Sequence, residues 1–321
     1  MKKQDVLFNA SMHLRLLLRV ERTLGIRKAI QAAVKPGAYV LDAGCGSGIL
    51  SFLALEAGAA SVVAVDRDNV DLARALAREN GLDRNIRFIE TDLNALEPAE
   101  IGEKVDTLLA FVYTNHVAVD EARSRTVATL RRRFGAKACR TVPNRVRYWA
   151  IACDWPQQDA FTELSDLRRS LQELENRYAL KFGPLLEAMT AEILFDRSRP
   201  TLYGDYKWLP GGSNGGYRHS RQGGRFLSDR VAVAEFAYDS GGGDERLPEQ
   251  VTLELRSAGT LTALLWVQEL WFDDFLIWSS EAFSPLATPL AARPGERVEA
   301  TLDERWRATN IIPVKPVGDA R

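Results

Sequence analysis

The sequence has few of the residues that bind metals or form disulfides. Its 321 residues include three histidines and three cysteines, Cys45, Cys139 and Cys153, and none of these stands in a metal-ligand spacing. An odd number of isolated cysteines argues against a disulfide framework and is typical of proteins in a reducing compartment. We therefore expect neither a metal site nor a disulfide.

The chain also lacks an excess of charge of either sign and a long apolar run. The formal net charge is −1, so nucleic acids and anionic lipid surfaces are not expected partners. Polar residues such as Asn9 and Arg15 interrupt the apolar stretch near the start, which argues against a signal peptide, and no apolar run is long enough to span a bilayer. These absences predict a cytoplasmic protein with no membrane partner, and the length predicts two domains.

What the chain does have is an apolar run that ends in alternating glycines, over residues 40–50. Asp42 lies within this run, and Gly44, Gly46 and Gly48 follow it. Glycines tolerate positive φ and let a ligand lie against the backbone at the N-terminus of the next helix. The pattern predicts a strand, a tight turn and a helix around a bound cofactor.

Expected strands and helices alternate on both sides of this turn. The strands are expected over 38–43, 61–65, 86–90, 105–111 and 145–152, and the helices over 49–57, 70–80 and 121–134, after one or two helices over 11–34. This alternation predicts an α/β fold with a Rossmann-like, doubly wound parallel sheet. Residues 1–36 would form an N-terminal helical lid, and 37–154 the cofactor-binding domain.

The pattern changes near residue 155. Apolar residues at intervals of three and four predict a helical arm over about 157–195. Beyond residue 200, glycine-rich loops separate runs of strand-forming residues, including a long run over 261–278. Residues 155–321 are therefore expected to form a mainly β, barrel-like acceptor domain that carries the arm as a helical insertion.

Acidic residues after two further strands narrow the choice of cofactor. Asp66 ends the second strand, where a carboxylate can bind both hydroxyls of a ribose. Asp92 follows the third strand and could accept a hydrogen bond from an adenine amine, although an Asx-type turn or a helix cap explains it almost as well. With glycines that have no pyrophosphate to hold, these acids favour S-adenosylmethionine over a nicotinamide dinucleotide.

On these residues the sequence resembles class I S-adenosylmethionine-dependent methyltransferases, and more closely the protein arginine methyltransferase family. The likeness is strong from His13 to about residue 150 and patchy beyond it. The resemblance implies that Arg22, on the N-terminal helix, binds the carboxylate of the cofactor. The helical arm lies where family members insert a dimerisation arm, which implies a homodimer by analogy.

The expected acceptor side departs from the family's pattern. A guanidinium has a pKa above about 12, so carboxylates must hold it, and family members carry two glutamates after the fourth strand. The first glutamate position falls on Phe111. The second falls on or beside Asp120 and Glu121, where a helix N-cap and a first helical turn explain both acids more simply. The family's Thr-His-Trp loop is also missing, because residues 284–289 occupy the corresponding region.

Residues behind the fourth strand are the candidate catalytic residues. Methyl transfer from a sulfonium is an in-line displacement, so the protein mainly positions the reactants and gives the acceptor's proton a route away. His116 has a suitable pKa for this role, and Tyr113, Asp120 and Glu121 are further candidates. Phe111 and Tyr113 could instead line a pocket for an aromatic or apolar acceptor.

Three interpretations remain open. The leading one is an S-adenosylmethionine-dependent methyltransferase of arginine-methyltransferase-like architecture that acts on an unidentified small molecule or protein side chain. The second is N-methylation of protein or free arginine, with Asp120 or Glu121 acting alone. The third is a non-catalytic partner or scaffold that only binds the cofactor.

Overall fold

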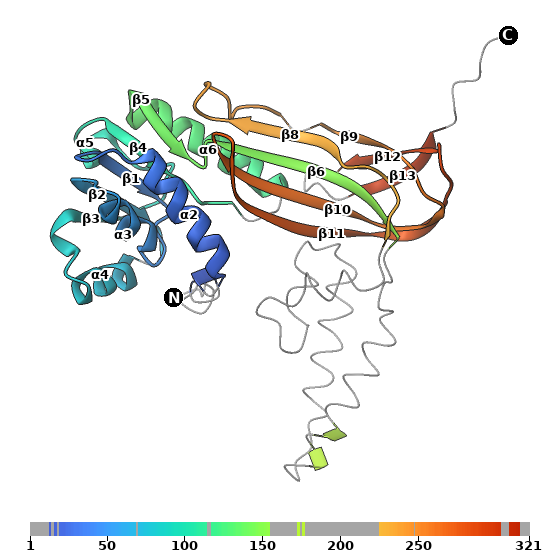
Figure 1. The fold of residues 1–321 in the computed structure, drawn as a ribbon, viewed down its shortest axis with the longest axis horizontal. Coiled ribbons are helices and arrows are strands. Elements are labelled where there is room, and N and C mark those ends of the chain that lie inside the picture. Colours follow the sequence, from blue (N-terminus) through green and yellow to red (C-terminus); the bar gives the residue numbers. More distant parts are fainter. Residues whose placement is uncertain are drawn as a thin grey trace. The chain divides into compact units, whose positions relative to one another are not determined.

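A computed structural model, drawn in Figure 1, gives the structure of the chain. It describes residues 19–154 except 69 and 114–116, residues 225–302 except 247, and residues 308–314, together with residues 13, 16, 17, 172, 173, 175 and 176. Most of the predicted helical arm over 157–195 lies outside the described residues. His116 lies outside them as well.

A parallel sheet of five strands forms the centre of the first half of the chain (Figure 1). Its strands are β1 (Tyr39–Ala43), β2 (Ser61–Asp66), β3 (Ile86–Glu90), β4 (Val105–Leu109) and β5 (Gly135–Val142). They lie in the order β3-β2-β1-β4-β5, and every neighbouring pair is parallel. The predicted α/β fold with a doubly wound parallel sheet is confirmed.

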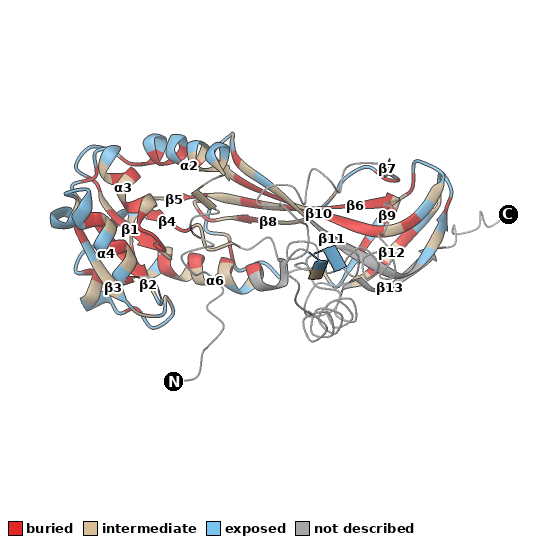
Figure 2. Ribbon diagram, turned by 90° about the horizontal axis from the view of Figure 1, so that it is seen from below, coloured by how far each residue is buried: buried red, intermediate tan, exposed pale blue. Residues whose placement is uncertain are grey.

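Helices cover this sheet and bury their apolar sides against it. They are α2 (Val20–Ala33), α3 (Ile49–Glu56), α4 (Val70–Glu79), α5 (Pro98–Ile101) and α6 (Val117–Phe134), with a 3-10 turn, η1 (Asp83–Asn85). In α2 the buried residues Ile26, Ala29, Ile30 and Ala33 recur at helical spacing. Figure 2 shows the strands as largely buried and the outer sides of α2 and α4 as exposed.

The strand order reverses at β1, and this reversal fixes where a ligand can bind. The chain passes from β1 to β2 and β3 on one side, and then returns to place β4 on the other side of β1. In open α/β sheets, ligands bind in the crevice outside the carboxyl ends of the strands at such a reversal. Here β1 ends at Ala43 and β4 ends at Leu109, so the glycine turn and residues 110–113 border one crevice.

The second half of the chain is mainly antiparallel β structure, as predicted. Its strands are β6 (Arg145–Asp154), β7 (Arg225–Phe226), β8 (Val231–Ala237), β9 (Gln250–Glu254), β10 (Gly259–Phe272), β11 (Phe275–Ala292), β12 (Arg297–Leu302) and β13 (Ala308–Val314). One sheet has the order β11-β10-β6-β7, with β8 also paired to β6, and another has the order β13-β12-β9.

Two local expectations were wrong. The strand over 145–152 was expected to continue the parallel sheet, but β6 pairs with β7 in antiparallel fashion, and the fifth parallel position belongs to β5, which the sequence did not predict. Helix α6 begins at Val117 rather than at Glu121. The strands expected over 261–278 are present as β10 and β11, which are separated at Asp273, whose φ is 50°.

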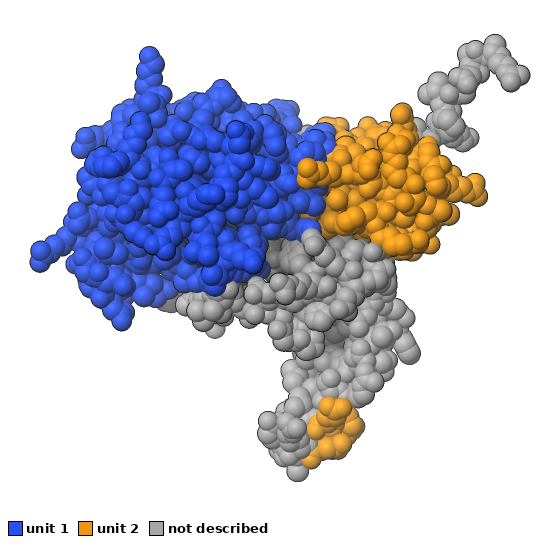
Figure 3. Space-filling view, viewed as in Figure 1, with its two compact units in different colours: residues 1–149, 232–248, 267–281 blue, residues 150–231, 249–266, 282–321 orange. Residues whose placement is uncertain are grey.

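Two compact units can be distinguished, as coloured in Figure 3. Unit 1 contains residues 1–149, 232–248 and 267–281, and unit 2 contains residues 150–231, 249–266 and 282–321. Unit 1 therefore combines the parallel sheet with segments from much later in the chain. The division into a lid, a cofactor domain and an acceptor domain stays a prediction. In the described part of the chain, no helix combines the length and the apolar character that crossing a bilayer requires.

Candidate active site

The glycine turn behind β1 requires glycine at each of its three positions. Gly44, Gly46 and Gly48 have φ values of 81°, 52° and 83°, which side-chain-bearing residues rarely adopt. The N–H groups of Gly44 and Cys45 both donate to the Val65 carbonyl, at 2.8 and 2.9 Å, and this ties the turn to the end of β2. These hydrogen bonds hold the backbone of the turn in place beside the crevice.

Asp66 lies at the end of β2, next to this turn. Its Oδ2 accepts the Gly46 N–H and its Oδ1 accepts the Asp68 N–H, both at 2.9 Å. These two backbone donors fix the orientation of the carboxylate. The structure thus brings Asp66, the residue predicted to bind the ribose, into contact with the glycine turn.

Asp42 is a buried acid whose hydrogen bonds are incomplete. Its Oδ2 accepts the Ser51 hydroxyl at 2.7 Å, whereas its Oδ1 is buried without a hydrogen-bond partner in the described part of the chain. Burial raises the pKa of Asp42 to about 7, an effect that the Ser51 hydrogen bond partly offsets. A buried acceptor without a donor is costly in free energy.

Arg22 is a cation that lacks a carboxylate partner among the described residues. Its guanidinium carbon lies 6.0 Å from the centre of the Phe111 ring, just beyond β4. Burial, and in second place the charge of Arg19, lowers the pKa of Arg22 to about 10. Because Phe111 and Val112 border the crevice with the glycine turn, Arg22 offers a positive charge there for an anion.

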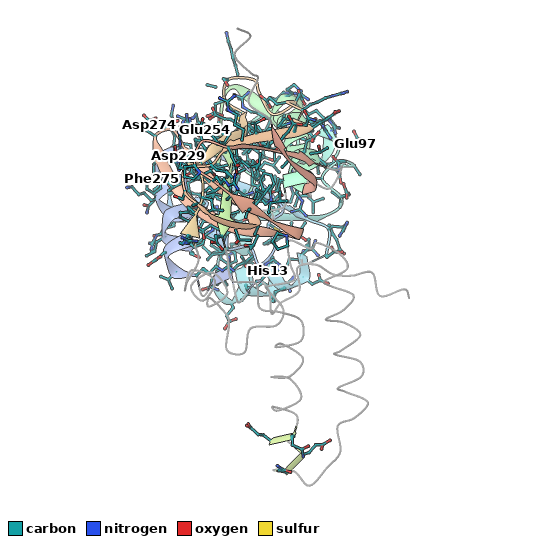
Figure 4. The ribbon with its side chains drawn as sticks, turned by 90° about the vertical axis from the view of Figure 1, so that its right-hand side faces the viewer. His13, Glu97, Asp229, Glu254, Asp274 and Phe275 are labelled. Atoms are coloured by element: carbon teal, nitrogen blue, oxygen red, sulfur yellow. The ribbon has the colours of Figure 1, made fainter. Side chains whose placement is uncertain are left out.

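His13 is a crevice residue that the sequence prediction did not include among the cofactor-binding residues. A Cβ added at Gly46 would lie 2.4 Å from the His13 Cε1 atom, so the imidazole packs directly on the turn (labelled in Figure 4). Burial lowers the pKa of His13, and the nearby charge of Asp66 acts in the opposite direction. Its position in the segment that resembles the family was the signal available in the sequence.

Asp92 lies at the carboxyl end of the sheet, after β3, but is exposed. Its Oδ1 accepts the backbone N–H of Asn94 at 2.9 Å and the side-chain amide of Asn94 at 3.1 Å. This is the Asx-type turn that the sequence offered as the alternative. A contact between Asp92 and adenine stays a prediction.

Asp120 is not an N-cap but a fully buried residue in the first turn of α6. Its Oδ2 accepts the Tyr148 hydroxyl and the Gln268 amide, both at 2.7 Å. The Gln268 amide also lies 2.6 Å from the Tyr148 oxygen, and the Ser280 hydroxyl lies 3.4 Å from the Gln268 Oε1. We call Asp120, Tyr148 and Gln268 the acceptor-side cluster.

Two further predicted catalytic residues, Tyr113 and Glu121, also have side-chain partners. The Tyr113 hydroxyl hydrogen-bonds the Tyr238 hydroxyl, and burial raises the pKa of Tyr113 well above its usual value. Glu121 forms an ion pair with Arg125, one turn further along α6. In the described part of the chain, histidine, cysteine and acidic side chains form no group of three that could hold a metal ion.

The sheet order, the glycine turn and the unpaired Arg22 are typical of the class I S-adenosylmethionine-dependent methyltransferase fold. A family model described as ribosomal protein L11 methyltransferase (PrmA) matches residues 22–118. The ribosomal protein L11 methyltransferase of Deinococcus radiodurans is 46% identical over 80 residues, which cover 24% of this chain and 29% of that protein.

Over nearly its whole length the chain resembles solved protein arginine methyltransferases in fold. Protein arginine N-methyltransferase PRMT10 of Arabidopsis thaliana is 28% identical over 162 residues, 49% of this chain and 41% of that protein. The solved structure of the Trypanosoma brucei PRMT1 enzyme–prozyme complex with AdoHcy has a TM-score of 0.60 at 17% identity, over 95% of this chain and 96% of that chain. The chain spans less than half the length of the curated relatives it matches, whereas the likeness of fold covers nearly all of it. The predicted resemblance is confirmed.

Proposed function

We propose that the chain is an S-adenosylmethionine-dependent methyltransferase. The observation that supports this proposal is Arg22, a partly buried cation that no carboxylate neutralises in the described part of the chain. Burying an unpaired charge is expensive, so an anionic ligand is expected to complete the crevice. The amino-acid carboxylate of S-adenosylmethionine is such an anion. The Trypanosoma brucei relative of similar fold was solved with AdoHcy, the product of methyl transfer from this cofactor.

The described residues fit this cofactor at several points. Arg22 would hold its carboxylate, and the Asp42 Oδ1 atom would accept its ammonium group. Asp66 would take the ribose hydroxyls, and the glycine turn would let the ligand lie against the backbone. Asp92 is proposed to contact the adenine. When bound, the cofactor supplies an electrophilic methyl group on a sulfonium, and the protein's part is to position it.

Calorimetric titration of the full chain with S-adenosylhomocysteine tests this proposal. The Arg22→Ala variant should bind about 100-fold more weakly, because a charge-assisted contact in a buried site is lost. Arg27→Ala is the matched control, since Arg27 lies on the same helix and pairs with Glu56 at the exposed surface. The proposal is wrong if the wild-type chain does not bind the ligand or if both variants bind it equally well.

The acceptor is proposed to be a small molecule or a protein side chain that is not held by two glutamates. Phe111 occupies the first glutamate position, and Asp120 is engaged within the acceptor-side cluster. The proposal includes a homodimer in the cytoplasm, with no nucleic acid or membrane partner. Sedimentation equilibrium of the purified chain tests the dimer.

A second candidate is a non-catalytic, cofactor-binding partner of another protein. Two features favour it: Phe111 occupies the first glutamate position, and the Asp120 carboxylate accepts hydrogen bonds from Tyr148 and Gln268. Glu121, beside the second position, pairs with Arg125. One relative of similar fold was solved as an enzyme–prozyme complex. Tight cofactor binding without turnover on any acceptor would support this candidate. Detection of methylated arginine, lost in Glu121→Gln, would instead support arginine N-methylation.

A further inference from the structure

We infer that the acceptor reacts through an atom that loses its proton more readily than a guanidinium does, the sulfur of a thiol or the oxygen of a phenol on an apolar body, and not through a guanidine. The inference rests on the proposed function and concerns the same crevice. Two observations support it: the apolar wall behind β4, and the Asp120 carboxylate that is held by two buried donors.

The crevice wall behind β4 is apolar where it meets the glycine turn. The Phe111 ring lies beneath the Arg22 guanidinium, 6.0 Å from its carbon. A Cβ added at Gly44 would lie 3.0 Å from the Val112 Cγ1 atom, so Val112 packs on the turn itself. Arg123 of α6 donates to the Val112 carbonyl and holds this segment in place. An acceptor beside the cofactor therefore meets a phenyl ring and an isopropyl group.

The carboxylate of Asp120 is not available to hold a cation. It accepts hydrogen bonds from Tyr148 and Gln268, and all three side chains are buried. Turning Asp120 toward an acceptor would leave two buried donors without partners, at a cost of about 1–3 kcal/mol for each donor. The cluster thus keeps Asp120 in a structural role.

The charge near the crevice wall also disfavours a guanidinium. Phe111 is neutral where the family has a glutamate. A bound sulfonium would add positive charge beside it. A guanidinium would meet this charge unaided, whereas a thiolate or a phenolate would be attracted to it.

The chemistry of a thiol or phenol needs no carboxylate in the site. Thiols ionise with a pKa of about 8.5 and phenols of about 10, against more than 12 for a guanidinium, so their proton can leave to solvent before the methyl group moves. The ionised sulfur or oxygen then attacks the methyl carbon. One S–C or O–C bond forms, and the bond from the methyl group to the sulfonium breaks with its electron pair kept by that sulfur, which becomes a neutral thioether.

The test incubates the full chain and S-adenosylmethionine with thiophenol, with 4-methylphenol and with N-acetylarginine amide, each beside a reaction without protein. Mass spectrometry measures S-adenosylhomocysteine and the methylated product. We expect transfer to one of the first two probes at least about 100-fold faster than to the arginine probe, with a rate that rises with pH through the ionisation of the probe. The two probes distinguish a thiol from a phenol. A methylated guanidine as the main product, or no transfer to either of the first two probes, overturns the inference.

A series of variants tests whether Phe111 determines the preference for a thiol or phenol over a guanidine. Phe111→Glu should lower kcat/KM for the preferred probe about 10-fold or more, whereas Phe111→Leu keeps the wall apolar and should lose much less. Phe226→Glu is the control, because Phe226 is 53% exposed and belongs to unit 2. Equal kcat/KM in Phe111→Glu and Phe226→Glu would overturn the assignment. Binding of S-adenosylhomocysteine is measured in parallel: a wild-type chain that does not bind it contradicts the proposed function, whereas one that binds it and methylates only arginine contradicts this inference alone.

Discussion

The donor side and the acceptor side of unit 1 differ in whether their polar groups have partners within the protein. On the donor side, which comprises Arg22, Asp42, the glycine turn and Asp66, a guanidinium has no carboxylate among the described residues and the Asp42 Oδ1 atom has no hydrogen-bond donor. On the acceptor side, the Asp120 carboxylate, the Tyr148 hydroxyl and the Gln268 amide bond to one another. The acceptor-side cluster is buried and the donor side is partly buried, and among the described residues only the donor side has buried polar atoms that lack a partner within its own group.

This difference separates a binding site from a structural network. Incomplete buried polar groups reduce stability, and proteins keep them where a ligand supplies the missing partner. A completed network favours one arrangement of the elements that carry it, here α6, β6 and β10. Substitutions on the two sides should therefore move stability in opposite directions, and four predictions follow from the largest effect to the smallest.

The largest effect is expected at Asp120. Asp120→Leu leaves the Tyr148 and Gln268 donors unpaired, so the free energy of unfolding should fall by about 3–5 kcal/mol. Glu121→Ala, one residue further on, removes only a partly exposed ion pair with Arg125 and should cost less than about 1 kcal/mol. Urea denaturation of both variants measures the two losses. Similar losses would show that the acceptor-side cluster contributes little to stability.

The ionised Asp42 carboxyl, in contrast to that of Asp120, should lower the free energy of unfolding. Its pKa is about 7 in the folded chain, against about 3.9 when exposed, so the stability it contributes is full below pH 4 and is lost as the pH rises through 7. Asp42→Asn keeps an acceptor for Ser51 and removes the charge. Between pH 4 and pH 8 the wild-type chain should lose roughly 2–4 kcal/mol more than this variant. Thermal unfolding across this pH range measures the difference. If the stability of the two proteins depends on pH in the same way, the interpretation that Asp42 lacks a partner for its charge is wrong.

The acceptor-side cluster should also show coupling between its two donors. Tyr148→Phe and Gln268→Leu each remove one hydrogen bond to the same Asp120 oxygen. The double variant should depart from additivity by about 1–2 kcal/mol, as residues in one network do. A double-mutant cycle measured by urea denaturation checks this. Effects that add within experimental error would mean that the two donors act independently.

The smallest effect is expected at Asp92. If Asp92 contacts the adenine, Asp92→Ala should weaken S-adenosylhomocysteine binding by about fivefold, which corresponds to the loss of one exposed hydrogen bond of about 1 kcal/mol. Asp71→Ala is the control, because Asp71 is an exposed acid on α4. If calorimetry finds that the two variants bind S-adenosylhomocysteine with equal affinity, Asp92 does not contact the adenine and only forms its turn.

Much of the donor side could be predicted because its signals are local. Asp42 and the three glycines lie within a few residues of one another, and Asp66 ends the next strand. The fold class follows from the regular alternation around them. Strand β5 was not predicted, because Gly135, Lys137 and Arg140 give it no alternating apolar pattern. Its position in the sheet comes from its pairing with β4.

The role of Asp120 could not be predicted, because its partners are distant in the sequence. Tyr148 lies 28 residues away and Gln268 lies 148 residues away. An acid in the first turn of a helix is common for local reasons, so the sequence favoured capping at this position. Only the tertiary fold places two buried donors beside it.

The distance between Asp120 and Gln268 also has a consequence for the synthesis of the protein. At about 5–20 residues per second, the 148 residues that separate them take roughly 7–30 s to be translated. During this interval the parallel sheet can form, but α6 holds a carboxylate that lacks one of its two donors. We therefore expect the nascent chain to reach native protection of α6 only after β10 has left the ribosome. The glycine turn and its crevice would be in place well before that.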